Sequence, residues 1–373
     1  MELSIADALS LRMSSLLLRG RPGPSSGPPK DVAGVVTWLG AMQAQDNASA
    51  MWSLGVRLPH LTAAGVHDSL ERREALRTWP MRGTVHLVPS RDAHWMLALT
   101  GVRALAGVAK RREYLGLSEA DADRAVELLR AALTGGKRLT RSECVRVIVD
   151  GGVPGADKLG YHLLWYASQK AVTCIAPLIG KEQSFVLLDE WVPDPVRLDP
   201  EEALATLTLR YFRGRGPSTR KDFAGWATLT AAEAKRGIAA CGDALRTVTV
   251  DGVEMVVAAD LLDAYDGGRV EPDDEFRVLS GFDEFLLGFK DRSLMVAEEH
   301  KQAIIPGGNG VFQSTISRGG RVIGTWKRTT GARRTVVSIF PLAKLTAKEH
   351  KAVEAAFVPY GRFVEAPLEF RRP

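Results

Sequence analysis

One arrangement of segments recurs along this chain: three helix-forming stretches, then two strand-forming stretches joined by a short turn. Helical spacing of apolar residues marks the helices, and β-branched runs mark the strands. The middle copy has predicted helices at residues 118–133, 140–150 and 159–170 and strands at 172–175 and 185–188. A later copy has predicted helices at 199–213, 219–226 and 231–241 and strands at 245–250 and 253–257.

The first part of the chain fits the same order. Helices are predicted at 4–18, 32–42 and 63–75, and strands at 76–81 and 83–88. Helices followed by a strand pair are typical of the winged helix, a relative of the helix-turn-helix. We therefore predict three tandem winged-helix units, at residues 1–115, 116–195 and 196–275.

Local capping signals support the repeat. Thr140 and Thr219 each begin the middle helix of a unit. Each is followed directly by Arg, and an acid stands three positions after the Thr. A Thr N-cap with an acid three residues on forms a capping box, and Ser118 and Asp121 have the same spacing. The pair Asp251-Gly252 predicts a type I′ turn between the last two strands.

After residue 275 the pattern changes to short strand-like stretches separated by glycines. Strands are predicted at 276–287, 303–305, 311–316, 321–327, 335–340 and 363–370, with one helix at 346–357. This alternation predicts a small antiparallel β-barrel-like domain over residues 276–373. The expected fold class is therefore α+β, with three winged helices followed by the barrel.

The composition is that of an ordinary globular protein, and its charge balance suits an anionic partner. Of the 373 residues, 45% are apolar and 25% are charged, and the net charge is +5 with a pI of about 9.1. The three cysteines are widely spaced and read as reduced packing residues. No apolar run approaches the ~18–20 residues of a membrane span, and residues 1–18 lack the pattern of a secretion signal. We expect a cytoplasmic protein without a metal or other cofactor.

Scattered cations on tandem winged helices suggest DNA as the partner, because Lys and Arg contact phosphates. A solvated charged surface is the alternative for each of them. The short turn that carries Arg333 and Arg334 has the shape and charge to enter a minor groove. The candidate phosphate contacts are Arg82, Lys110, Arg111, Arg112, Lys137, Arg138, Arg141, Arg210, Arg213, Arg215, Arg220, Lys221, Lys327, Arg328, Arg333 and Arg334.

The segment from Met42 to Asn47 carries two glutamines at the end of an early apolar helix. Gln43 lies four residues after Leu39, so on a continuing helix it would face the apolar side, where an unpaired amide costs about 1–3 kcal/mol. If the chain leaves the helix near Gln43, residues two apart can share a side, and Gln45 joins Gln43 in one cleft. A structural amide near a cap is the alternative.

Other polar residues could line the same cleft, namely Asp46, Asn47, Trp52 and His86. For His86 we favour a core position over the cleft. Residues 282–285 (FDEF) and 290–292 (KDR) place acids among aromatics and bases, and an ion-paired structural corner is favoured there over a catalytic dyad. The seven histidines show no metal-ligand spacing.

Four ordered motifs together resemble a known family. They are residues 42–46 (MQAQD), 77–88 (RTWPMRGTVHLV), 282–292 (FDEFLLGFKDR) and 306–312 (PGGNGVF). They are similar to the bacterial winged-helix DNA glycosylases of the AlkZ type, which unhook interstrand crosslinks and excise bulky alkylated purines. The resemblance implies three winged helices and a β-barrel, a catalytic Gln-x-Gln at Gln43 and Gln45, and self-resistance to a genotoxic natural product.

The implied chemistry suits carboxamides. A guanine alkylated at N7 is cationic and leaves as a neutral base, so the protein must mainly place a water and stabilise charge on the sugar. We expect Gln45 to position the water and Gln43 to orient it or to support the sugar, acting as a monofunctional glycosylase. Asp46 is the rival carboxylate base.

Two readings without catalysis compete with this one. A DNA-binding regulator would bind a sequence tightly as a dimer and release no base, although three different winged helices in one chain argue against a palindrome-reading dimer. A protein-interaction scaffold would lack DNA affinity even at low salt. Nothing in the sequence demands more than a monomer.

Overall fold

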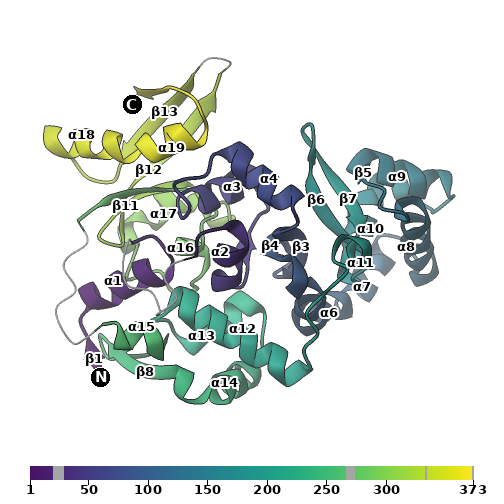
Figure 1. Cartoon of the computed structure of the whole chain (residues 1–373), viewed down its shortest axis with the longest axis horizontal. Helices are drawn as coiled ribbons and strands as arrows, with labels where there is room; N and C mark the ends of the chain where they lie inside the picture. The colour runs from purple at the N-terminus through teal and green to yellow at the C-terminus, as the bar shows by residue number, and fades with distance from the viewer. Residues whose placement is uncertain (20–28, 266–273, 332–333, 372–373) are drawn as a thin grey trace. The chain divides into compact units, whose positions relative to one another are not determined.

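The computed structural model describes residues 1–19, 29–265, 274–331 and 334–371. Contacts divide the chain into two compact units, of which unit 1 comprises Met1–Val66 with Ala205–Pro373 and unit 2 comprises His67–Leu204. Both units mix helices with β-sheet, so the α+β class is confirmed (Figure 1). None of the described helices has the length and apolar character needed to cross a membrane. The boundaries between the winged-helix units and the C-terminal domain, at residues 115, 195 and 275, stay a prediction.

In unit 2, two hairpins form one continuous sheet with strand order β4-β3-β6-β7-β5. The strands are β3 (Ala75–Met81), β4 (Thr84–Pro89), β5 (Leu139–Thr140), β6 (Thr173–Ile179) and β7 (Glu182–Leu187). Strand β3 is buried along its whole length, and Arg77 on β3 pairs with Ile175 on β6. The hairpin predicted for the first copy therefore shares a sheet with the hairpin of the second.

The predicted helices of unit 2 are present with their caps. Ser118 accepts the N–H of Asp121 at the start of α8, and Thr140 forms a capping box with Glu143 at the start of α9. Burial of Leu129 and Ile148 marks the inner faces of α8 and α9. The helices of this unit are α5 (Ala93–Met96), a π-helix (Leu97–Gly101), α6 (Val102–Ala106), α7 (Val108–Tyr114), α8 (Glu119–Leu133), α9 (Arg141–Asp150), α10 (Ala156–Gln169) and α11 (Leu188–Trp191).

In the N-terminal part of unit 1 the three predicted helices end three or four residues earlier than expected. Helix α2 ends at Leu39 rather than at residue 42, because Gly40 has φ of +74° and breaks the helical path. The chain continues through the short strand β2 into α3, a helix that the sequence pattern does not predict. The elements here are β1 (Glu2–Leu3), α1 (Ile5–Ser15), α2 (Val32–Leu39), β2 (Met42–Gln43), α3 (Asn47–Gly55) and α4 (Ala63–Glu71), which leads into unit 2.

The middle part of unit 1 repeats the helix-helix-helix-hairpin order. Thr219 forms the predicted capping box with Asp222, and both Asp251 (φ +50°) and Gly252 (φ +73°) adopt the positive φ of a type I′ turn. Strand β1 pairs in parallel with β8 and gives the sheet order β1-β8-β9. The elements are α12 (Pro200–Arg215), α13 (Arg220–Ala227), α14 (Ala231–Ala240), β8 (Leu245–Val250), β9 (Val253–Ala258) and α15 (Ala259–Asp263).

The C-terminal part of unit 1 is an open five-stranded sheet with order β10-β11-β12-β13-β14 (Figure 1). Its first and last strands do not pair with each other in the described part of the chain, and β14 runs parallel to β13. The prediction of an antiparallel barrel-like domain is therefore corrected to an open, mostly antiparallel sheet. The strands are β10 (Phe276–Leu279), β11 (Ser314–Arg318), β12 (Arg321–Thr330), β13 (Thr335–Pro341) and β14 (Leu368–Arg371).

Two predicted strands of this region are helical over part of their length. Residues 284–287 form α16 (Glu284–Leu287) because Asp283 caps the N–H of Phe285, and residues 301–304 form α17 (Lys301–Ile304). The predicted helix at 346–357 is present as α18 (Ala347–Ala356), and α19 (Val358–Phe363) follows it. Trp326 on β12 contacts Phe357 and Tyr360 edge-on, so these helices complete an aromatic core with the sheet.

Candidate functional site

The two glutamines lie on the connection between α2 and α3. Gly40 turns the chain out of α2, and Asp46 ends the connection as the N-cap of α3, where its Oδ2 accepts the N–H of Ser49 at 2.8 Å. Gln43 is 8% exposed, whereas Gln45 is exposed to solvent. The segment is therefore fixed at both ends by helix boundaries, and one of its two carboxamide residues is in contact with water.

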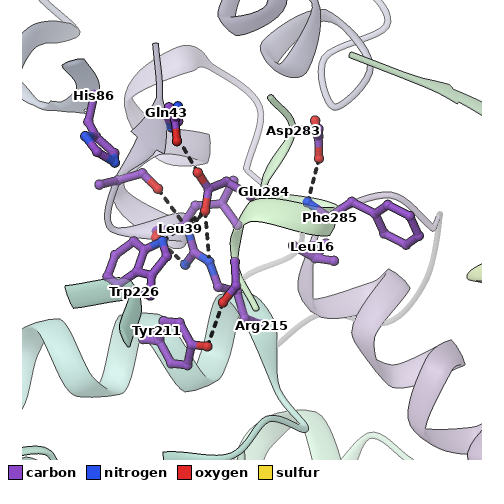
Figure 2. Close-up of polar contacts among 12 residues, drawn as sticks. Leu16, Leu39, Gln43, His86, Tyr211, Arg215, Trp226, Asp283, Glu284 and Phe285 are labelled. Atoms are coloured by element: carbon purple, nitrogen blue, oxygen red, sulfur yellow. Dashed lines mark hydrogen bonds and ion pairs between the residues drawn. The ribbon is translucent and has the colours of Figure 1, made fainter. Parts of the chain in front are cut away.

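A buried carboxylate holds the backbone of Gln43. Glu284 Oε1 accepts the N–H of Gln43 at 2.9 Å, and Glu284 Oε2 accepts the indole N–H of Trp226 at 3.0 Å. Arg215 completes the contact by donating Nη2 to the same Oε2 at 2.6 Å. Figure 2 shows Glu284 between Gln43 and the pair formed by Arg215 and Trp226. Sequence analysis singled out Glu284 as an acid but gave no signal for these partners.

The same arginine also binds the chain just before Gln43. Arg215 donates Nη1 to the carbonyl oxygen of Leu39 at 2.7 Å and Nη2 to that of Ala41 at 2.9 Å. Its guanidinium lies over the ring of Trp226, 4.3 Å from the centroid. We define Arg215, Trp226 and Glu284 as the clamp, because together they bind backbone groups of residues 39, 41 and 43.

A second buried ion pair adjoins the clamp. Arg57 binds Asp283 through two hydrogen bonds of 2.7 and 2.9 Å, and it also donates to the carbonyl oxygens of Leu16 and Ser53. The side chains of Arg57 and Asp283 are 0% and 2% exposed. The expectation of an ion-paired corner at residues 283 and 284 is confirmed, since both acids are fully engaged.

Two predicted cleft residues belong to the core. Trp52 is 2% exposed, donates its indole N–H to Val278 and packs edge-on against Tyr360, so its assignment to a cleft is wrong. His86 is 0% exposed, which confirms the favoured core position, and its ring nitrogens lie 2.8 Å from the carbonyl oxygen of Thr84 and from Arg82 Nη2. Asp46 stays exposed at its cap, and Asn47 is the first residue of α3.

The predicted phosphate contacts divide by exposure. Arg112 and Arg215 are wrong as DNA contacts, because they are 8% and 0% exposed and pair with Glu119 and Glu284. Arg138 binds Glu71, and the half-buried Arg82 contacts His86. Those with exposed side chains are Lys110, Lys137, Arg141, Arg220, Lys221, Lys327 and Arg334. Arg333 and the side chain of Arg111 lie outside the described residues.

A groove of about 830 Å³ lies between α13, α14 and the β8–β9 hairpin of unit 1. Four exposed cations line it, namely Arg220, Lys221, Lys235 and Lys290, and in the described part of the chain no carboxylate lies within ion-pairing distance of any of them. Its three acids are Asp222, Glu254 and Asp291, and Asp222 is satisfied by the N–H groups of residues 219, 290 and 291. We call this feature the basic groove; sequence analysis missed Lys235 and Lys290.

The cysteines are packing residues, as predicted. All three are free thiols, and Cys144 and Cys174 are buried. Burial raises the pKa of Cys144 to about 12 and also raises the pKa of Cys174, so both thiols stay protonated at neutral pH. Among the described residues, no group of three His, Cys, Asp or Glu side chains could hold a metal ion.

Comparisons with known proteins agree with the four sequence motifs. An interstrand DNA cross-link repair glycosylase of Streptomyces sahachiroi is 26% identical in an alignment of 373 positions that covers 96% of each chain. The solved structure of the Streptomyces sahachiroi DNA glycosylase AlkZ matches with a TM-score of 0.81 at 26% identity and covers 100% of both chains. The family model described as DNA glycosylase AlkZ-like matches residues 36–363, and the chain therefore belongs to the AlkZ-like DNA glycosylase family.

Proposed function

We propose that this protein is a monofunctional DNA glycosylase that hydrolyses the N-glycosidic bond of bulky N7-alkylguanine adducts or interstrand crosslinks. Its role would be self-resistance to a genotoxic natural product. Family membership supports the reaction class, and the relative from Streptomyces sahachiroi carries crosslink repair in its name. The observation that carries the site assignment is the backbone N–H of Gln43, which is bound by a buried carboxylate beside an exposed Gln45.

The proposed reaction needs little proton transfer to the base. Water attacks C1′ of the sugar while the bond from C1′ to N9 breaks, the cationic adduct leaves neutral, and a proton passes from the water to solvent. A carboxamide oxygen accepts a hydrogen bond from the attacking water, and its NH2 group fixes the orientation. The exposed Gln45 suits the water, and the nearly buried Gln43 suits the sugar and the orientation of its neighbour.

The proposed substrate is double-stranded DNA, bound through the exposed cations by a protein acting as a monomer. We interpret the three helix-and-hairpin repeats as winged helices in consecutive units at residues 1–115, 116–195 and 196–275. Element order supports this, since in the second repeat β5 precedes α9 and pairs with β7 of the hairpin. An open cleft on such modules tolerates a tethered lesion that cannot swing freely into a closed pocket.

The test is base release from duplexes that carry N7-alkylguanine or a crosslink, followed by mass spectrometry of the free adduct and by counting abasic sites. We expect release by the native protein and a loss of about a hundredfold in Gln45→Ala, because positioned hydrogen-bonding groups contribute factors of this order. Gln43→Ala should lower the rate as well. Near-native excision by Gln45→Ala would defeat the assignment.

Asp46→Asn is the matched control for the rival carboxylate. Asn caps helices as well as Asp does, so this variant removes the charge of Asp46 and keeps the cap of α3. We expect nearly unchanged excision. Abolished turnover in Asp46→Asn with normal turnover in Gln45→Ala would reverse the two roles, and tight DNA binding without base release by the native protein would favour the regulator.

A further inference from the structure

We propose that Glu284 and Arg215 are positioning residues that set the backbone register of the Gln43-Ala44-Gln45 segment. This inference rests on the proposed function, because it concerns the groups assigned to the reaction there. The hydrogen bonds of the clamp to this part of the chain reach backbone groups, at residues 39, 41 and 43. Its effect on the reaction is therefore indirect.

The local chain explains why charged groups are needed at this place. Helix α2 ends at Leu39, so the carbonyl oxygens of its last turn lack helical partners, and the chain then runs through buried residues Ala41 and Met42. Arg215 supplies donors for the carbonyl oxygen of Leu39 at the helix end and for that of Ala41 after it, and Glu284 supplies the acceptor for the Gln43 N–H. An apolar pair of equal volume would leave all three backbone groups unsatisfied.

The spacing of the contacts defines the register. The clamp binds the last residue of α2 (Leu39), the residue just before β2 (Ala41) and Gln43 within β2, so it fixes the path by which the chain leaves the helix and enters the strand. A slip of one residue would exchange the sides taken by successive side chains and would move the carboxamides relative to the substrate. The clamp thus selects the arrangement in which Gln43 is nearly buried and Gln45 is exposed.

The molecule offers a matched control in the neighbouring ion pair. The side chains of Arg57 and Arg215 are both 0% exposed, and each donates to a buried acid and to two backbone carbonyl oxygens. The hydrogen bonds of Arg57 go to Leu16, Ser53 and Asp283 rather than to the glutamine segment. A purely structural role for buried arginines predicts equal consequences of Arg57→Lys and Arg215→Lys.

The experiment compares Arg215→Lys, Glu284→Gln and Arg57→Lys in the full-length protein by amide hydrogen exchange, single-turnover excision and DNA affinity. In Arg215→Lys and Glu284→Gln we expect faster exchange at the Gln43 amide and excision slower by about tenfold or more, because small misplacements of reacting groups cost factors of about 10². DNA affinity should stay within about twofold. Arg57→Lys should lower thermal stability to a similar degree. It should leave the amide exchange at Gln43 and the rate of excision unchanged.

Trp226→Phe serves if a buried-charge variant fails to fold, since it removes the indole N–H donated to Glu284 without changing a charge and keeps a smaller aromatic ring beneath Arg215. It should show the same exchange and rate changes in weaker form. Equal exchange and equal excision rates in the Arg57 and Arg215 variants would overturn the proposal. If Gln43→Ala and Gln45→Ala both excise normally, the proposed catalytic roles fail, whereas the exchange contrast still decides whether the clamp sets the segment.

Discussion

At Gly288 the chain passes so close to the clamp that a side chain would not fit. A Cβ at this position would lie 2.7 Å from the carbonyl oxygen of Glu284 and 2.8 Å from Cδ of Arg215. The hydroxyl of Tyr211 also donates to the Gly288 carbonyl oxygen at 2.8 Å, which fixes the local backbone. The glycine in the motif at 282–292 therefore has a packing reason, which is to let Arg215 reach Glu284.

We predict that Gly288→Ala lowers the free energy of unfolding by about 1–3 kcal/mol, because overpacking displaces neighbours that are already closely packed. Urea unfolding of the purified protein measures this. The matched control is Gly225→Ala on α13, where the nearest atom to a new Cβ is Lys290 Cδ at 3.8 Å and where Ala favours the helix. A stability loss in the control as large as that of Gly288→Ala would contradict the packing argument.

Among the elements, the β12–β13 hairpin carries several cations, of which some are exposed and others already bind protein groups. Lys327 is exposed, whereas Arg328 donates to the hydroxyl of Tyr360 at 2.9 Å. Arg334 is 62% exposed and forms an ion pair of 2.7 Å with Glu369 on β14. An exposed ion pair contributes only about 0–1 kcal/mol, so a DNA phosphate can compete with Glu369 for Arg334.

We predict that Arg333→Ala combined with Arg334→Ala weakens DNA binding and lowers the salt slope of log K by about 2, since each phosphate contact releases about 0.9 counterion. Fluorescence anisotropy of a labelled duplex over a range of salt concentrations measures both quantities. Thr329→Ala in the same hairpin is the uncharged control. An unchanged slope in the double variant would exclude the hairpin from the interface.

For the whole molecule, the net charge of +5 does not say where an anionic partner binds, because that depends on where cations without acidic partners lie. Several surface arginines bind nearby acids, as Arg91 binds Asp194 and Arg246 binds Asp263. The basic groove differs, because its four cations have no such partners in the described residues and outnumber its three acids. We therefore propose the basic groove as a surface for a sugar-phosphate backbone.

We predict that replacing Arg220, Lys221, Lys235 and Lys290 together by Ala lowers the salt slope of DNA binding by about 3–4, because each phosphate interaction contributes about 0.9 to the slope. The rate of excision at saturating DNA should change little, because the hydrogen bonds that hold the glutamine segment come from the clamp and not from these four residues. Lys344→Ala with Lys348→Ala controls for net charge alone. A slope change per charge no larger than in this control would refute the groove as a DNA-binding surface.

Much of the secondary structure was predictable from the sequence, because it depends on interactions between residues close together in the chain. The capping boxes at Thr140 and Thr219 and the turn at Asp251-Gly252 depend on residues within three positions of one another, and all are present as predicted. The two glutamines stand out in the sequence because their motif is contiguous. The early end of α2 had a local signal in Gly40, and the brief helix α16 had one in its N-cap Asp283, although the apolar run after it favoured a strand.

The sequence by itself therefore determined the long helices of the repeats, their caps, the hairpins and the family motifs, since each of these depends on near neighbours or on contiguous residues. Tertiary structure alone decided that Trp52 packs in the core, that Arg215 is buried rather than available to DNA, and that Glu284 binds Gln43. The physical reason is distance along the chain. The hydrogen bond from Gln43 to Glu284 spans 241 positions, and an interaction of that range leaves no periodicity or spacing from which it could be predicted.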